Sequence, residues 1–164
     1  MTTPPTPAAT AAPDVQKSPA TQASHALARL EHELAHPPFH AVLAPQAVSA
    51  DPCGEVVIRL PYQAQFRRAQ DSGDIHGGVI ASIIDIAAHA AVAVQIERMA
   101  PTIDLRIDYL RAARAGELHV SARTLRVGRA IARVDVEVRS ADAIVVAVGR
   151  GTFSTAINDT GSKQ

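Results

Sequence analysis

The sequence has little cysteine, few aromatic residues and no net charge, and each shortage excludes a class of protein. The single cysteine, Cys53, excludes an intrachain disulfide, a zinc ribbon and a CxxC redox site. Sixteen basic and sixteen acidic side chains cancel, which argues against a general nucleic-acid binder, because such proteins need excess lysine and arginine. Tryptophan is absent and aromatic residues make up 3%, so Ala, Val, Ile and Leu must build the core.

No segment is typical of a membrane span or of a leader peptide. The longest apolar stretch, residues 79–96, contains Asp85, His89 and Gln95, each of which is costly in lipid. Residues 1–24 lack the continuous hydrophobic run of a secretory signal and the arginines of a mitochondrial presequence. We therefore expect a cytoplasmic protein that does not associate with membranes.

The 164 residues, 47% apolar and 20% charged, suffice for one packed domain. Residues 1–24 hold five of the eleven prolines and almost no large apolar side chain. Such a segment buries too little surface to offset its ordering entropy, which predicts a disordered tail. Residues 156–164 are similar, so the folded domain is expected over residues 25–155.

Hydrophobic periodicity predicts the elements of this domain. A helix is expected over residues 24–36, and a longer one over residues 77–97 that is apolar, and hence buried, on nearly every face. Apolar runs and alternation predict strands over residues 54–60, 102–110, 118–127, 131–139 and 143–153. Short turns make the last strands mostly antiparallel. The order favours an α+β fold in which one curved antiparallel sheet wraps around the long helix.

The first helix contains an HExxH pattern, from His32 to His36. At about 100° per residue, the two histidines lie about 140° and 180° from Leu27 and so point away from the apolar stripe. Pro37 ends the helix directly afterwards, and no third ligand is obvious. A solvent-facing helix is therefore favoured over a zinc protease site, and we expect no metal site.

The second candidate is His76-Gly77-Gly78, which opens the long helix. A helix N-terminus presents free backbone N–H groups and the positive end of the helix dipole. Glycine there lets a ligand approach the backbone closely. Such a site suits a carbonyl oxygen that becomes an oxyanion.

Asp85 follows eight residues after Gly77, among isoleucines. A carboxylate in such surroundings is costly unless it is paired, through backbone N–H groups or His89, or used in chemistry. Eight helical residues span about 12 Å, so Gly77 and Asp85 of one chain cannot hold the same carbonyl carbon. A catalytic role for both therefore predicts a homodimer with the site at its interface.

Four motifs together identify a family. They are the HGG, the aspartate nine residues after its histidine, the strand TIDLRIDYLR and the turn RVGR. Over about residues 54–155 the chain resembles the hotdog-fold acyl-CoA thioesterases of the phenylacetate-degradation (PaaI-like) type. The resemblance implies a hotdog fold, dimers often paired into tetramers, and hydrolysis of a coenzyme A thioester without a cofactor.

The resemblance also implies a role for each matching residue. Gly77 would polarise the thioester carbonyl through its N–H, and Asp85 would act as general base or nucleophile. His76 would position the site, and Thr102 would orient water or the carboxylate. Gln70 stands where many members have asparagine; glutamine occurs at this position in a related 4-hydroxybenzoyl-CoA thioesterase branch, so Gln70 is expected to be a polar helper.

Coenzyme A carries phosphates, for which arginine is well suited because it donates two hydrogen bonds at once. The candidates are Arg111, Arg114, Arg126 and Arg129, and Arg111 and Arg129 lie within the family-like motifs.

The acyl group is expected to be aryl or short to medium in length, for which small residues along the long helix leave room: Ala87, Ala88, Ala90 and Ala91. Two alternatives stay open. One is an acyl-CoA-binding hotdog protein without turnover. The other is a hotdog hydratase or dehydratase, in which Asp85 works with His89 or His76 as acid and base.

Overall fold

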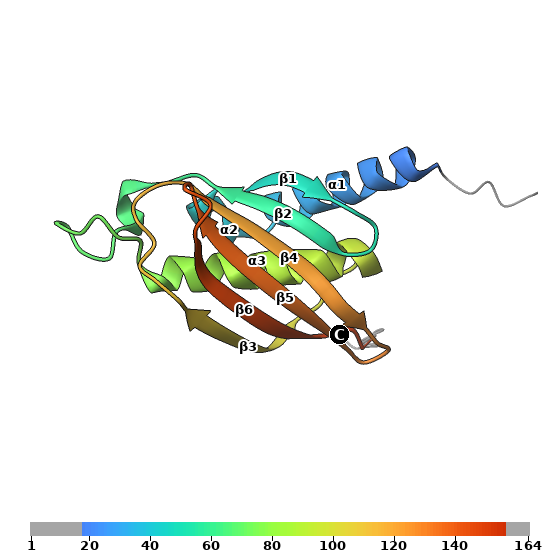
Figure 1. Ribbon diagram of the computed structural model, residues 1–164. Coiled ribbons are helices and arrows are strands. Elements are labelled where there is room, and N and C mark those ends of the chain that lie inside the picture. Colours follow the sequence, from blue (N-terminus) through green and yellow to red (C-terminus); the bar gives the residue numbers. More distant parts are fainter. Residues whose placement is uncertain (1–17, 157–164) are drawn as a thin grey trace, which may run out of the picture.

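The computed structural model describes residues 18–156, in which a six-stranded antiparallel sheet wraps one long helix (Figure 1). The helices are α1 (Pro19–Ala35), α2 (Pro38–Leu43), the short 3-10 helix η1 (Ala64–Phe66) and α3 (Gly77–Ile96). The strands are β1 (Gln46–Ala50), β2 (Glu55–Leu60), β3 (Thr102–Tyr109), β4 (Leu118–Val127), β5 (Ile131–Ser140) and β6 (Val145–Ser154). Their order in the sheet is β1-β2-β4-β5-β6-β3. The predicted α+β hotdog architecture is confirmed.

The first helix begins earlier than predicted. Ser18 caps α1, its side chain accepting a hydrogen bond from the N–H of Thr21, and Pro19 occupies the first helical position. Serine followed by proline is a helix-start signal that does not depend on apolar residues, whereas the prediction relied on the leucine stripe. Residues 19–24 thus belong to α1, with Ser18 as its cap. The rest of the predicted tails, residues 1–17 and 157–164, lies outside the described residues.

Three elements were missed, namely α2, β1 and the single turn η1. Pro37 and Pro38 end α1 as predicted, but Pro38 also opens α2, because proline is favoured at the first position of a helix. Strand β1 then pairs antiparallel with β2. Its side chains are exposed or half-buried, so its sequence carries no strong apolar alternation.

Helix α3 packs in the concave face of the sheet and fills the core. Its buried residues include Ile83, Ile84 and Ala87, which meet inward side chains such as Val120 and Val134 of β4 and β5. By length and composition α3 could span a membrane, but 61% of its apolar window is buried within the domain. The prediction that α3 is buried on nearly every face is too strong, because a stripe with Gly78, Ser82 and Asp85 stays partly open.

The close packing of α3 on β6 gives a stability prediction. A Cβ atom added at Gly149 would lie 2.5 Å from Cγ2 of Ile84. Because a β-branched side chain in a core turns with difficulty, we expect Gly149→Ala to lower the free energy of unfolding by about 1–3 kcal/mol in chemical denaturation. Gly73→Ala, with nothing within 4 Å, is the control and should change it by less than about 0.5 kcal/mol. Equal stability of both variants would show that α3 can shift on the sheet.

Strand β3 forms one edge of the sheet and is incompletely covered (Figure 1). Its predicted apolar face is only partly buried: Leu105 and Ile107 are half-buried, whereas Ile103 is 59% and Tyr109 is 53% exposed. The following residue, Leu110, is 51% exposed. The described chain thus presents an apolar strand edge beside α3, of the kind that pairs with another strand.

Candidate active site

The N-terminus of α3 presents an open backbone donor. His76 caps the helix, because its Nδ1 accepts the N–H of Gly78 at 2.9 Å and its carbonyl accepts the N–H of Val79 at 3.0 Å. Among the hydrogen bonds of the described residues, none uses the N–H of Gly77. This N–H is therefore available to an oxygen acceptor, at the positive end of the helix dipole.

Tyr109 was not predicted as a site residue, yet it lies directly against Gly77. Its hydroxyl donates a hydrogen bond of 2.9 Å to the Gly77 carbonyl, and its ring lies 3.4–3.5 Å from where a Cβ of residue 77 would stand. The alternation of β3 suggested a core side chain, and nothing local in the sequence indicates this contact. Gly77 and Tyr109 line a hollow of about 370 Å³, together with Arg68, Asp74 and Arg111.

Asp85 lies two turns further along α3 and is held by the start of β3. Thr102 Oγ1 donates a hydrogen bond of 2.9 Å to Asp85 Oδ1. The aspartate is half-buried rather than enclosed by isoleucines, because it lies on the open stripe of α3. The structure therefore brings Thr102 to Asp85, in the way that a residue orienting the carboxylate requires.

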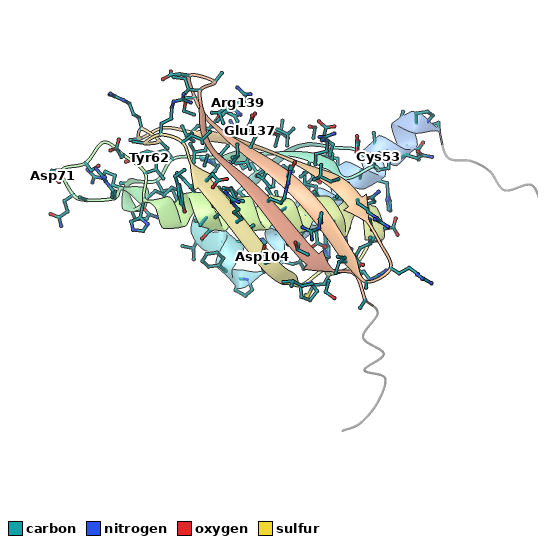
Figure 2. All side chains as sticks on the ribbon, turned by 60° about the horizontal axis from the view of Figure 1, so that its bottom comes forward. Cys53, Tyr62, Asp71, Asp104, Glu137 and Arg139 are labelled. Atoms are coloured by element: carbon teal, nitrogen blue, oxygen red, sulfur yellow. The ribbon has the colours of Figure 1, made fainter. Side chains whose placement is uncertain are left out.

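The remaining polar candidate, Gln70, does not join either group within this chain. It lies in the loop between η1 and α3, where its carbonyl accepts a hydrogen bond of 2.9 Å from Arg67. Its side chain is exposed, and the neighbouring Asp71 marks the far tip of this loop (Figure 2).

The predicted phosphate-binding arginines divide between the two ends of β3. Arg111 lines the hollow beside Gly77, and its guanidinium donates to the Val145 carbonyl at 2.7 Å. Arg126 and Arg129 lie near the β4–β5 turn, at the opposite end of the sheet. Thr155, which follows β6, donates hydrogen bonds to the carbonyls of residues 128 and 130 in that turn. Because this end of β6 pairs with Thr102, the turn lies near the Thr102 end of β3. Arg114 is exposed, and its backbone forms an isolated β-bridge with Asp74, which lines the same hollow as Gly77.

The HExxH residues do not form a metal site. His32 and His36 are exposed, as predicted, and stack on each other with ring centroids 3.6 Å apart. Glu33, between them, instead turns inward and is buried. Within residues 18–156 no group of three or more His, Cys, Asp or Glu side chains could hold a metal ion.

His89, which was predicted either to orient Asp85 or to fill the core, turns to Glu33. Its Nδ1 lies 3.8 Å from Glu33 Oε2, and its Nε2 accepts the N–H of Ala100 at 3.4 Å. Burial lowers the pKa of His89 below its ordinary value, although the negative charges of Glu33 and Asp85 oppose this. His89 is therefore neutral near pH 7, as a nitrogen that accepts a hydrogen bond requires.

A larger hollow, of about 660 Å³, lies on the outer face of the sheet and holds none of the predicted residues. It is lined by opposite charges, among them Asp135 and Arg150, which form two hydrogen bonds of 2.6 and 2.8 Å. The hydrogen bond from Arg150 lowers the pKa of Asp135. Figure 2 shows the acidic side chain of Glu137 beside Arg139, whereas Asp104 lies apart from both. The candidate catalytic residues Gly77 and Asp85 instead lie on α3, at the opposite face of the sheet.

The described groups suit acyl transfer to water. A backbone N–H at a helix N-terminus can stabilise a developing oxyanion, and a carboxylate held by a hydroxyl can accept a proton or attack a carbonyl carbon. These two functions lie at opposite ends of β3, Gly77 beside Tyr109 and Asp85 beside Thr102.

Comparisons with known proteins agree with this chemistry. The sequence pattern of the thioesterase superfamily matches residues 72–147. A Halobacterium salinarum protein named as an esterase is 34% identical over 127 residues, which cover 70% of this chain and 83% of that protein. Medium/long-chain acyl-CoA thioesterase YigI of Salmonella typhimurium is 34% identical over 95 residues, 48% of this chain and 61% of YigI. The solved PaaI protein of the E. coli phenylacetic acid degradation operon superposes with a TM-score of 0.73 at 24% identity, covering 81% of this chain and 94% of PaaI.

Proposed function

Because the chain belongs to the thioesterase superfamily, as a PaaI-like hotdog thioesterase, we propose that it hydrolyses acyl-CoA thioesters to a free acid and coenzyme A. The observation that carries this proposal is a pair of groups on α3: an unused N–H on Gly77, and a carboxylate on Asp85 held by Thr102. A protein that only binds acyl-CoA has no need of that carboxylate.

In the proposed reaction the thioester carbonyl accepts the N–H of Gly77, and Asp85 takes a proton from the attacking water. The oxyanion that forms is stabilised at the helix N-terminus. The carbon–sulfur bond then breaks, and coenzyme A leaves with that proton as the free thiol. Direct attack by Asp85, followed by hydrolysis of the resulting anhydride, uses the same residues and leads to the same products.

The two halves of the site would meet across a homodimer. Thr102 and Tyr109 lie at opposite ends of β3, so antiparallel pairing of two free β3 edges sets the Thr102 end of one copy against the Tyr109 end of the other. Asp85 of one copy then approaches Gly77 of its partner. The exposed apolar side chains Ile103, Tyr109 and Leu110 support this interface. Pairing of dimers into tetramers stays a prediction.

The substrate is proposed to carry an aryl or a short to medium acyl chain, and the likeness to YigI extends the range to longer chains. The acyl group has no room beside Ala87, Ala88, Ala90 and Ala91, because these are at most 1% exposed. It would instead lie along the open stripe of α3, with Arg111 and the partner's β4–β5 turn, Arg126 and Arg129, near the phosphates. His76 and Gln70 are proposed as positioning groups, and the cytoplasm as the location.

Thiol release tests this proposal. Wild-type protein is assayed with a colorimetric thiol reagent across aryl-, short-, medium- and long-chain acyl-CoA esters, and release that varies with the acyl group is expected. Saturable binding without release of thiol would contradict hydrolysis and favour the binding protein. A change in enoyl absorbance without thiol would favour a hydratase, although His89 faces Glu33 and leaves Asp85 without a histidine partner of that kind.

Thr102 offers a second test of the assignment. Thr102→Val keeps the shape of the side chain but removes the hydroxyl that donates to Asp85, so the carboxylate is no longer oriented. We expect kcat to fall about tenfold with little change in KM, as for loss of one hydrogen bond to a charged group. Thr102→Ser keeps the hydroxyl and should retain most of the rate; an equal loss in both variants would contradict the role of this hydrogen bond.

A further inference from the structure

A buried polar cluster, formed by Arg29, Glu33, His40 and His89, joins α1 and α2 to α3. Arg29 Nη2 lies 2.5 Å from Glu33 Oε1, and His40 Nδ1 lies 3.1 Å from the Glu33 carbonyl. The side chain of Glu33 is 11% exposed and that of His89 is 19% exposed. Buried charges are costly unless they are paired, so these four side chains must keep their positions relative to one another.

His89 connects this cluster to the start of β3. Because Nε2 accepts the N–H of Ala100, the ring proton lies on Nδ1, the atom that faces the Glu33 carboxylate. Glu33 thus favours the one tautomer in which Nε2 can accept. Ala100 is fully buried and precedes Thr102 by two residues.

Two residues on the same face of α3 therefore hold the short segment from Ala100 to Thr102. Asp85 receives the hydroxyl of Thr102, and His89, one turn later, receives the N–H of Ala100. Thr102 pairs with Phe153 of β6, and this pairing is irregular between Thr102 and Asp104, so the hydrogen bond to His89 is a second hold on the segment just before the irregularity.

From this geometry we infer that Glu33 and His89 are positioning residues for Asp85, a role that rests on the proposed thioesterase function. Glu33 orients His89, His89 holds Ala100, and Ala100 sets Thr102 against the Asp85 carboxylate. Neither residue touches the substrate. The inference extends the functional site to α1 and gives the inward-facing glutamate of the HExxH pattern a role that involves no metal.

Protonation of His89 would break this connection, because a second ring proton on Nε2 would face the N–H of Ala100. The groups that face His89 are Glu33 and Arg29 of α1, His40 of α2 and Asp85 of α3. Since burial is the largest influence and lowers the pKa of His89, the connection persists at neutral pH and is lost as the pH falls below the usual histidine range.

The test compares two replacements of His89 in the full chain. His89→Leu removes the acceptor and should lower kcat about 10- to 100-fold at nearly unchanged KM, because small displacements of a reacting group have large effects on rate. His89→Gln carries an oxygen near the position of Nε2 that does not titrate. It should keep kcat within about threefold and lose the contribution of His89 to the acid limb of the pH–rate profile. Glu33→Gln should lower kcat less than His89→Leu does.

Two controls remove charge or imidazole from the surface: Glu31→Gln on α1 and His119→Leu on β4, both exposed. Amide hydrogen exchange at Ala100 and Thr102 should speed up in His89→Leu and not in the controls.

A His89→Leu protein with wild-type kcat, pH profile and exchange, but a lower unfolding temperature, would show that the cluster only docks α1 and would overturn the inference. If His89→Leu does not fold, an acid limb in His89→Gln identical to that of the wild type overturns it. Absence of thiol release by the wild type would instead refute the proposed function, and the exchange measurement would still report whether His89 holds this segment.

Discussion

Asp85→Asn is expected to reduce thioester hydrolysis by about 10³-fold or more while leaving the fold and the proposed dimer intact. The asparagine oxygen can still accept the hydroxyl of Thr102, so the side chain keeps its place. An amide, however, neither takes a proton from water nor attacks a carbonyl carbon. General-base catalysis alone contributes about 10²–10⁴, and loss of a nucleophile costs at least as much. Thiol release with the best ester of the panel measures the effect.

Asp104→Asn is the matched control. Asp104 is exposed and lies at the end of β3 that contacts Asp85, but on the outer face of the sheet. It removes the same charge and should leave the rate unchanged. Circular dichroism and size-exclusion chromatography verify the fold and the dimer of both variants. An Asp85→Asn protein that retains most of its rate would remove Asp85 from the mechanism.

Gly77→Pro is expected to lower kcat by about 10²–10³, the usual cost of one oxyanion donor. Proline lacks the N–H that is proposed to polarise the thioester. The first position of a helix tolerates proline well, and His76, with φ −63° and ψ 134°, already has the backbone conformation that precedes a proline. Among the described residues no hydrogen bond is lost, since none uses this N–H. The unfolding temperature should therefore change little.

Gly77→Ala is the control for bulk at this position. It keeps the N–H, and its methyl group would make ordinary contacts with the Tyr109 ring from 3.4 Å. A donor role predicts a larger loss in the proline variant than in the alanine variant. Equal losses would mean that space beside Tyr109 matters and that the N–H does not.

Mixing the Asp85→Asn protein with the Gly77→Pro protein tests whether the active site lies between two chains. A dimer of one Asp85→Asn chain and one Gly77→Pro chain has both defects in one site and none in the other. Random exchange of subunits should therefore restore about a quarter of wild-type activity. A site within one chain predicts no recovery, and that result would exclude the interface.

The residues that open and line α3 could be read from the sequence because their roles are local. Two glycines after a histidine cap make a helix N-terminus that a ligand can approach, and helix geometry alone separates Gly77 from Asp85. The strands were predicted well wherever one face is buried, as in β5, where Val134, Val136 and Val138 alternate with charged residues. Strand β1, which buries neither face fully, gave no such signal.

The sequence by itself determined the fold class, the long core helix, the outward direction of His32 and His36, and the family. The tertiary structure alone decided that Thr102 meets Asp85, that Tyr109 meets Gly77, that Glu33 turns inward to His89, and that β3 is an uncovered edge. The physical reason is the range of the interactions. Periodicity and capping depend on neighbours within a few residues, whereas these contacts join residues between 17 and 56 positions apart. Which of such pairs forms depends on how the whole sheet curves around α3.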